Sequence, residues 1–376
     1  MRSELRMRVL VLGGFADSLI NFRGELLRSL RGRGCEVIAC APDASPQVRQ
    51  ALAGMGVEYR HAPLARAGLN PLADMASLWR LRRLLRELKP DVFLGYTIKP
   101  VIYGSLAAAS AGVPRIYSMI TGLGYAFSAR GAKAKAVGWL AIRLYRRALM
   151  VNERVFFQNP DDMAMFRELG IMKPGQRSVM IPGSGVDIDE FRPAPFPKEM
   201  SFLLIARLLR QKGIAEYAEA ARRIRQGHPH VRFRLAGWLD EGPDSISEIK
   251  LRAWVDEGTL EYLGRLDDVR PALADSSVYV LPSYREGMPR TVLEAMAMGR
   301  PIITSDAPGC RLTVNPGENG YLVPVGNAEA LADAMERFIL EPDCISGMGA
   351  ASRRLAEERF DVRIVNTIIL KAMGLN

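Results

Sequence analysis

VYVLPSYREGMPRTVLEAMAMGRPIITSD, residues 278–306, contains a complete strand–helix–strand unit. The apolar run VYVL is typical of a short buried strand. Pro289 suits the first turn of a helix, where its missing N–H is no loss, and Gly299 is the residue expected just past the helix end. The apolar run PIITS follows at once as a second strand. Such units build parallel sheets that are covered by helices.

The same alternation continues in both directions along the 376 residues. The first half predicts strands at RVLVLGG, CEVIACAP, VEYRHAPL and PDVFLGYT, and the first of these is read as a strand rather than as a signal peptide. RPAPFPKE, residues 192–199, has the composition of a linker. We therefore predict an α/β protein with two doubly wound domains, residues 1–195 and 196–376. Its amphipathic terminal helix packs back on the first domain, and ligands bind in the cleft at the carboxyl ends of the strands.

Composition limits the class of protein. An apolar content of 48% describes a globular chain, and no stretch approaches the length of a membrane-spanning helix. Four cysteines without a CxxC pair indicate reduced thiols, and three histidines in poor positions indicate no metal site. A DID triplet at 187–189 lies in a loop and is interpreted as a loop-capping motif, not as a metal ligand set.

The net charge of +10 is unevenly distributed. Residues 1–195 hold 28 basic and 16 acidic residues, a balance of +12, whereas residues 196–376 hold 23 and 25, a balance of −2. No acid occurs between Asp91 and Glu153, although eight basic residues do. A solvated basic face does not explain this absence of acids, so the window predicts a surface that meets anions.

Two glutamates and two cations carry the chemistry. Glu286 precedes Gly287 at the mouth of the helix, where backbone N–H groups can hold a diphosphate. Glu294 lies inside the apolar helix, where a buried carboxylate needs a partner and could accept hydrogen bonds from two ribose hydroxyls. In LLIARLLRQKG, Arg207 and Lys212 follow a strand and can neutralise a diphosphate leaving group. These residues predict a nucleotide-sugar site.

The turn after the first strand is ambiguous. Gly13 and Gly14 permit a tight turn, and Ser18 is a candidate helix cap. The spacing is not GxGxxG, so no dinucleotide site is predicted. A phosphate approaching the backbone and a bare strand–helix turn are equally good interpretations.

These motifs, with GENGYLVPV, resemble the retaining glycosyltransferases of family four, which have the GT-B fold. SLINFRGELLRSL, YTIKPVIYGSLAA and FFQNPDDMAMF narrow the resemblance to enzymes that extend undecaprenyl-diphosphate-linked sugars, N-acetylgalactosaminyltransferase-like. The resemblance implies transfer of a hexose or N-acetylhexosamine from a UDP-sugar to a polyprenyl-diphosphate-linked sugar in surface polysaccharide or glycan synthesis. It also implies no cofactor, no essential metal, and a peripheral position on the cytoplasmic face of the membrane.

Carried over onto this sequence, the resemblance implies the following donor-binding residues: Gly14, Arg207, Lys212, Glu286, Gly287, Met288, Pro289 and Glu294. Glu286 would contact the donor sugar at the reacting centre, Glu294 the ribose, and Arg207 and Lys212 the departing diphosphate, so Glu286, Arg207 and Lys212 are the catalytic candidates. Some relatives carry an acid or a histidine where Thr121 stands here, which leaves an acceptor-side base unassigned.

The acid-free window fits a lipid-linked acceptor. As a helix, residues 128–151 would present Val137, Leu140, Leu144, Ala148 and Val151 on one face and basic residues elsewhere, a pattern typical of interfacial helices. A core helix with a solvated basic edge is the alternative. The acceptor and membrane candidates are Lys99, Thr121, Gly122, Lys133, Lys135, Arg143, Arg146 and Arg147. An anionic membrane surface is the expected partner.

Two other functions compete with this one. A non-hydrolysing UDP-sugar 2-epimerase has a similar two-domain fold, but it needs acid/base groups that the three histidines are poorly placed to supply. A basic nucleic-acid-binding protein would fit a pI of 9.6, yet the chain carries no recognisable nucleic-acid motif. Nucleic acid is therefore not expected as a partner.

Overall fold

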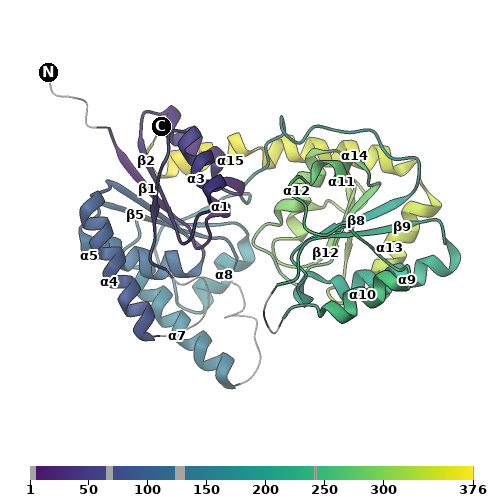
Figure 1. Cartoon of the computed structure of the whole chain (residues 1–376), viewed down its shortest axis with the longest axis horizontal. Coiled ribbons are helices and arrows are strands. Elements are labelled where there is room, and N and C mark those ends of the chain that lie inside the picture. Colours follow the sequence, from purple (N-terminus) through teal and green to yellow (C-terminus); the bar gives the residue numbers. More distant parts are fainter. Residues whose placement is uncertain (1–5, 65–70, 123–131, 241, 243, 376) are drawn as a thin grey trace. The chain divides into compact units, whose positions relative to one another are not determined.

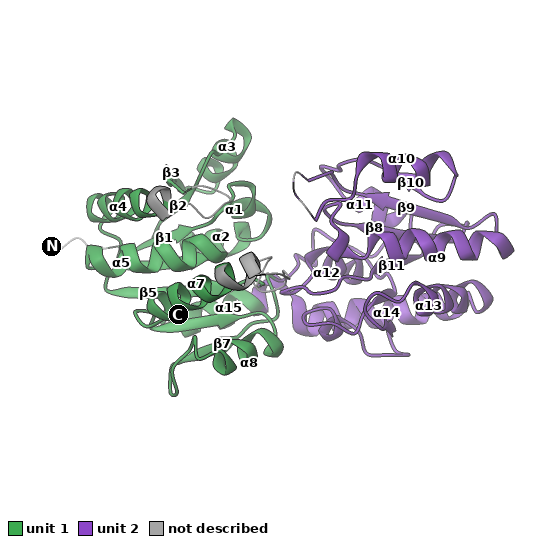
Figure 2. Ribbon diagram, turned by 90° about the horizontal axis from the view of Figure 1, so that it is seen from below, with its two compact units in different colours: residues 1–184, 365–376 green, residues 185–364 purple. Residues whose placement is uncertain are grey.

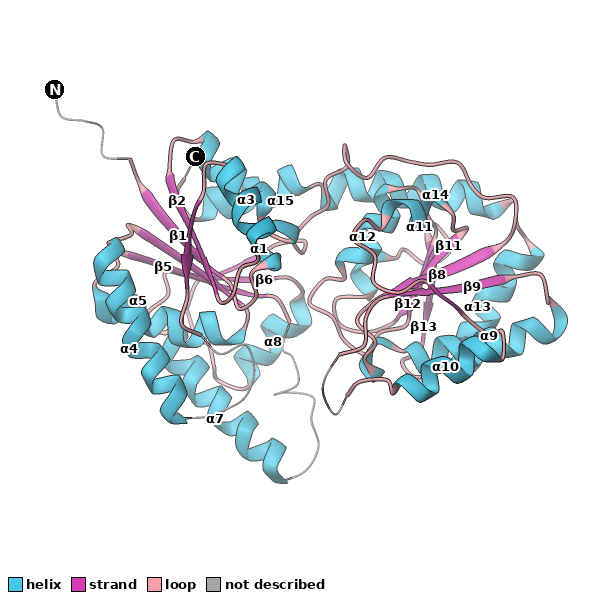
Figure 3. Cartoon of the chain, viewed as in Figure 1, coloured by secondary structure: helices cyan, strands magenta, loops and turns pink. Residues whose placement is uncertain are grey.

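The computed structural model describes residues 6–64, 71–122, 132–240, 242 and 244–375, with the backbone alone for 71–73 and 132–136. The chain forms two compact units, residues 1–184 with 365–376, and residues 185–364 (Figure 2). Each unit is a parallel sheet with helices on both of its faces (Figures 1 and 3). The predicted α/β class is confirmed.

The first unit is built on a seven-stranded parallel sheet in the order β3-β2-β1-β4-β5-β6-β7. Its strands are β1 (Arg8–Leu12), β2 (Glu36–Ala41), β3 (Glu58–His61), β4 (Val92–Tyr96), β5 (Arg115–Ile120), β6 (Arg154–Phe157) and β7 (Ser178–Met180). Its helices are α1 (Asp17–Asn21), α2 (Gly24–Gly32), α3 (Pro46–Gly54), α4 (Pro71–Leu88), the π-helix η1 (Pro100–Gly104), α5 (Ser105–Ala111), α7 (Ala132–Leu149) and α8 (Pro160–Glu168). The predicted first strand is β1.

Helices cover both faces of this sheet, because successive side chains along each strand point to opposite faces and both sets are apolar. Val9 and Val11 of β1 face a core shared with α1, α2, α3 and the last helix, α15 (Val362–Ala372). Leu10 and Leu12 face the opposite core, which α4 and α5 cover, while α7 packs on β5 and β6. Residues 365–376 thus belong to the first unit.

The second unit is built on a six-stranded parallel sheet in the order β10-β9-β8-β11-β12-β13. Its strands are β8 (Ser201–Ile205), β9 (Arg232–Ala236), β10 (Glu261–Tyr262), β11 (Val278–Leu281), β12 (Ile302–Ser305) and β13 (Gly320–Val323). Its helices are η2 (Arg210–Lys212), α9 (Ile214–Gly227), α10 (Glu248–Asp256), α11 (Arg270–Ala274), α12 (Arg290–Ala297), η3 (Arg311–Thr313), α13 (Ala328–Leu340), α14 (Cys344–Leu355) and the π-helix η4 (Ala356–Phe360). The sequence patterns missed β13 and α14.

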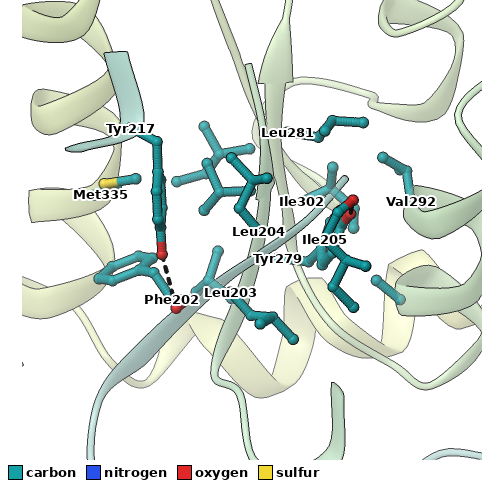
Figure 4. Close-up of a cluster of buried hydrophobic side chains, with 14 of the residues drawn as sticks. Phe202, Leu203, Leu204, Ile205, Tyr217, Tyr279, Leu281, Val292, Ile302 and Met335 are labelled. Carbon is teal, nitrogen blue, oxygen red and sulfur yellow. Dashed lines mark hydrogen bonds between the residues drawn. The ribbon is translucent and has the colours of Figure 1, made fainter. Parts of the chain in front are cut away.

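The second core is packed around β8, all five residues of which are buried. Figure 4 shows Tyr217 of α9 and Met335 of α13 on one side of this strand and Val292 of α12 on the other. The Tyr217 hydroxyl donates to the Phe202 carbonyl at 2.9 Å, so its one polar atom is paired inside the core. This packing fixes the strand whose carboxyl end carries the predicted cations.

The predicted linker belongs to the second unit, which begins at Gly185 rather than at residue 196. The Arg300 side chain is fully buried and donates to the carbonyls of Ala194 and Pro195 at 2.9 and 3.0 Å. Its guanidinium also lies over the Phe196 ring, 4.5 Å from the centroid. Burial lowers the pKa of Arg300 to about 10, which still leaves it charged at neutral pH. These contacts hold the proline-rich segment against the second unit.

Candidate functional site

The loop that follows β11, residues 282–289, is held from two sides. The Tyr284 N–H donates to the Gln211 carbonyl at 2.9 Å, in the turn that follows β8. The Glu286 N–H donates to the Pro308 carbonyl at 3.0 Å, in the loop that follows β12. Three loops at the carboxyl end of one parallel sheet therefore position Glu286, as expected for a ligand site in this class of fold.

Glu286 and Lys212 form an ion pair in this loop cluster. Their side chains are only 14% and 18% exposed, so solvent screens the pair weakly. The Ser283 hydroxyl, which is fully buried, donates to the same Glu286 oxygen, Oε1, at 2.8 Å. The sequence predicted Glu286 and Lys212 as site residues but indicated neither their pairing nor the contribution of Ser283.

Arg207 lies at the end of β8 and pairs with Asp240, its Nη1 atom 2.9 Å from Oδ2. Asp240 follows β9, the neighbouring strand, so both side chains lie at the same sheet edge. Asp240 was not predicted from the sequence, although an acid shortly after a strand of the second unit was an available signal. Both predicted cations therefore form ion pairs with carboxylates, Lys212 with Glu286 and Arg207 with Asp240.

Glu294 is buried in α12, with 6% of the residue exposed. Arg290 lies one turn earlier and donates from Nε to the Glu294 carboxylate at 2.7 Å, which confirms that this carboxylate has a partner. Burial raises the pKa of Glu294, and Arg290 opposes the shift. Pro289 is the residue before the helix rather than its first residue, whereas Gly299, with φ of 73°, ends it as predicted.

Two glycines that the sequence analysis missed shape these loops. Gly309 has φ of 77°, and a Cβ there would lie 2.4 Å from the Glu286 carbonyl. Gly213 has φ of 71°, and a Cβ there would lie 2.1 Å from the Pro282 carbonyl. Only glycine permits this approach in a left-handed conformation. Among the other predicted residues, Gly287 and Pro289 are buried, and Met288 packs half-buried against the core.

In the first unit, Gly14 lies in the turn after β1, where a Cβ would approach the Thr97 hydroxyl at 2.7 Å. The turn therefore packs against the end of β4. Ser18 is not the cap of α1, which the sequence suggested, because α1 begins at Asp17 after Ala16. Its hydroxyl instead donates to the Phe15 carbonyl and lies 2.7 Å from the hydroxyl of buried Tyr96.

Lys99 was expected to offer its charge to an acceptor, but its side chain is buried beside Asp74, with Nζ 2.9 Å from Oδ1. The Tyr103 hydroxyl donates to the other oxygen of Asp74, also at 2.9 Å. This cation is therefore neutralised inside the unit. Thr121 and Gly122 follow β5 and are half-buried, and Gly122 has φ of 127°.

The residues predicted to share one apolar face of α7 are divided in the structure. Leu140 and Val151 are exposed, as an interfacial face requires, whereas Ala148 is buried and Leu144 packs half-buried on the core beside Tyr145 and Leu149. Among the predicted basic residues, Arg143, Arg146 and Arg147 are exposed, and Arg146 donates to the carbonyls of Gly170 and Leu169. The side chains of Lys133 and Lys135 lie outside the described residues.

Comparison with known proteins assigns the family. Residues 21–183 match the model of a glycosyl transferase 4-like domain, and residues 199–341 match the model of glycosyl transferases group 1. The chain belongs to the family 4-type glycosyltransferases. One match falls on each compact unit. The match to residues 199–341 contains all the candidate residues of the second unit described above.

Two curated relatives of this glycosyltransferase act on lipid-linked sugars by their names. The N,N'-diacetylbacillosaminyl-diphospho-undecaprenol alpha-1,3-N-acetylgalactosaminyltransferase of Campylobacter jejuni is 28% identical over 89% of each chain. The UDP-Gal:alpha-D-GlcNAc-diphosphoundecaprenol alpha-1,3-galactosyltransferase of Escherichia coli is 29% identical over 72% of this chain and 71% of its own. Both are similar to this chain over both halves.

Solved structures establish the GT-B fold of the glycosyltransferase. Sucrose-phosphate synthase from Thermosynechococcus elongatus superposes with a TM-score of 0.79 at 18% identity, over 97% of this chain and 98% of its own. Anabaena Alr3699/HepE in complex with UDP-glucose superposes with a TM-score of 0.77 at 19% identity, over 98% and 100% of the two chains. The predicted architecture is confirmed.

The described part of the glycosyltransferase contains no cluster of three metal-ligating side chains. Asp187 of the DID triplet accepts the backbone N–H groups of Asp189 and Glu190 at 2.9 and 3.1 Å, so the triplet is the loop-capping motif that the sequence predicted. Within the described residues, no helix is both long and apolar enough to cross a bilayer.

Proposed function

We propose that this glycosyltransferase moves a hexose or N-acetylhexosamine from a UDP-sugar to a polyprenyl-diphosphate-linked sugar. The observation that carries the proposal is the group of Arg207, Lys212, Glu286 and Glu294 at the carboxyl end of the second sheet. A diphosphate requires cations, which Arg207 and Lys212 supply. The donor sugar and the ribose require hydrogen-bond acceptors, which are Glu286, held by the buried Ser283, and Glu294, buried in the adjoining helix.

Each residue has a separate part in the proposed reaction. The bond between the sugar C1 and the UDP oxygen breaks, the acceptor hydroxyl oxygen bonds to C1, and the proton of that hydroxyl passes to the departing diphosphate. Arg207 and Lys212 offset the negative charge that develops on the departing diphosphate, a role that requires no metal ion. Glu286 accepts hydrogen bonds from the donor sugar, Glu294 accepts them from the ribose, and Gly287 to Pro289 line the pocket. We expect the product to keep the anomeric configuration of the donor.

The acceptor half of the proposal rests on the relatives and on charge. Both relatives described above are named for undecaprenyl-diphosphate-linked substrates. The first half of this chain holds the whole excess of positive charge. Such a charge attracts a protein to the lipid diphosphates and anionic lipids of a membrane leaflet. We therefore propose that the transferase works peripherally on the cytoplasmic face of a membrane, in the synthesis of a surface polysaccharide or related glycan.

Release of UDP from a panel of UDP-sugars tests the proposal. We expect release to require a polyprenyl-diphosphate-linked sugar, to favour one UDP-sugar, and to disappear in Glu286→Gln. Glu219→Gln, which changes a 61% exposed acid on α9, is the matched control and should keep full activity. Consumption of GDP-sugars in place of UDP-sugars would overturn the donor class, and conversion of a UDP-sugar without any acceptor would favour the epimerase.

Asp240→Asn is expected to tighten UDP binding by up to about fivefold. Asp240 occupies Arg207 before a donor arrives, so a diphosphate must compete with this carboxylate. The Arg207 side chain is 45% exposed, and solvent-screened pairs of this kind contribute at most about 1 kcal/mol. Calorimetric titration of UDP, at low and moderate salt, measures the change.

The control for this titration is Asp256→Asn, which removes an exposed acid at the end of α10. The control should bind UDP as the wild type does. Weaker binding in Asp240→Asn would mean that Asp240 orients Arg207 for the diphosphate instead of competing with it.

A further inference from the structure

Two helices of the first unit expose large apolar side chains beside arginines. On α4, Met75 and Trp79 are 68% and 61% exposed, and Arg83 and Arg86 continue the same stripe. The four positions are spaced by four, four and three residues, so they share one side of the helix. The opposite side of α4 supplies Leu81 and Leu85 to the core, and the stripe therefore faces solvent.

The outer side of α7 repeats this arrangement. Trp139 is 58% exposed, Arg143 and Arg147 follow at helical spacing, and Met150 at the end of the stripe is 50% exposed. The Arg143 guanidinium lies over the Trp139 ring, 4.7 Å from its centroid. Packing among the described residues of the unit explains neither face, and exposed apolar groups of this size mark interaction surfaces.

The two stripes lie in one layer of the unit. Both α4 and α7 contact η1 and α5, which lie between them. Figures 1 and 2 show α4, α5 and α7 on the same face of the sheet. Side chains that point away from the sheet on α4 and α7 therefore point to the same side. α5 adds no charge and no large side chain except the half-buried Leu106 to this layer.

We propose that Met75, Trp79, Arg83 and Arg86 of α4 form, with Trp139, Arg143 and Arg147 of α7 and with Met150 just after it, a two-helix surface that docks on an anionic lipid bilayer. The inference rests on the proposed function, because a lipid-linked acceptor lies in such a bilayer. It extends the predicted basic helix to a second helix, α4, which precedes the acid-free window.

The positive charge of the surface indicates that its partner is an anionic bilayer. The two stripes carry four arginines, and no acid occurs from residue 92 to residue 152, which includes η1, α5 and α7. Asp74, the acid nearest the start of the α4 stripe, is buried and paired with Lys99, and Glu87 at the helix end is the exposed acid on α4. Tryptophan settles at the level of lipid headgroups, and each arginine near an anionic leaflet strengthens binding about fivefold.

Vesicle binding by the full chain tests the surface. The probe is a vesicle of phosphatidylethanolamine with 30% phosphatidylglycerol, compared with phosphatidylcholine, at moderate salt (about 0.15 M). We expect binding to the anionic vesicles alone. Met75→Ser/Trp79→Ser is expected to weaken it at least tenfold, and Arg143→Gln/Arg147→Gln by a similar factor. Ile249→Ser/Arg252→Gln, which removes an 83% exposed isoleucine and an exposed arginine from α10, should bind as the wild type does.

Two results would overturn the inference. The first is a wild-type chain that ignores anionic vesicles, and the second is an α4 variant that binds them normally. If the same substitution also dissociates a wild-type dimer, the second result would assign the surface to a second copy of the chain. Circular dichroism and thermal melting check that each variant is folded.

A second assay separates this inference from the proposed function. With a short-chain, water-soluble diphosphate-linked acceptor, the α4 variant should release UDP at the wild-type rate, because its donor site is unchanged. With the long-chain acceptor in anionic vesicles, its rate should fall at least tenfold. Equal rates of both proteins in vesicles would refute the surface alone, whereas no turnover by the wild type in either format would refute the proposed function.

Discussion

Lys212→Met is expected to lower kcat for sugar transfer by about 10²–10³ and to weaken UDP binding about tenfold. Lys212 is one of two cations at the proposed diphosphate site, and loss of a single group that stabilises developing negative charge typically costs a factor of this size. The substitution also removes the cation that pairs with the Glu286 carboxylate, which is 14% exposed and keeps its hydrogen bond from Ser283. Removing one partner of an ion pair this buried destabilises the fold as well.

The double variant Lys212→Met/Glu286→Gln separates these two effects. Removing both charges of the ion pair leaves no carboxylate that has lost its cation, so the melting temperature should return toward the wild-type value. Activity should remain low, because neither the diphosphate nor the donor sugar regains its contact. Lys212→Arg, which keeps the charge, should retain measurable turnover. Steady-state kinetics with the preferred UDP-sugar and thermal melts give both readouts. Full activity in either methionine variant would remove Lys212 from the proposed mechanism.

The fold was predictable because each strand pattern is local. Runs such as RVLVL and SFLLI are apolar after their first residue, since parallel strands are covered on both faces, and the structure has β1 and β8 there. β13 was missed because GYLV is short and lies between glycine-rich turns, and its residues Tyr321 and Leu322 are only half-buried. The position of a strand that short depends on the sheet it joins.

The site was predictable in residue type but not in pairing. Lys99 and Lys212 both follow a strand of a Rossmann-like unit, and both were expected to offer a charge to a ligand. Packing buries Lys99 against Asp74, 25 residues earlier in the chain, while Lys212 pairs with Glu286, 74 residues later. Nothing local distinguishes the two lysines, because the partners come from distant elements.

The division of the predicted α7 face has a similar cause. The helix carries apolar residues on nearly every side, so its sequence does not show which of them pack on the core and which are left exposed. The structure buries Ala141 and Tyr145 and exposes Leu140. Tyr145 fixes which side of α7 faces the core, because its ring packs edge-on against Phe166 of α8, with ring centroids 5.2 Å apart. That partner is visible only once the helices are packed.

Glu294→Gln is expected to weaken UDP binding by about 10–100-fold and to leave the melting temperature unchanged or higher. The carboxylate is the proposed acceptor for ribose hydroxyls, and a hydrogen bond to a charged group contributes about 1.5–3 kcal/mol. Glutamine keeps the shape of the side chain and one acceptor for Arg290, which lies 2.7 Å away. It also removes the cost of ionising a group that is 6% exposed.

The pH dependence of stability and of binding should run in opposite directions. Burial raises the pKa of Glu294 above its unfolded value, so the folded chain binds this proton more readily than the unfolded chain. Its contribution to stability is therefore largest below the unfolded pKa and falls as the pH rises through the folded pKa. UDP affinity should rise over the same range, because the ionised carboxylate is the better acceptor. Glu294→Gln should remove both slopes, measured by melting and by titration of UDP over a pH series that starts near the unfolded pKa of glutamate (about 4.3) and rises from there. A variant that binds UDP like the wild type would exclude Glu294 from ribose recognition, and a variant that melts many degrees lower would make it a structural residue.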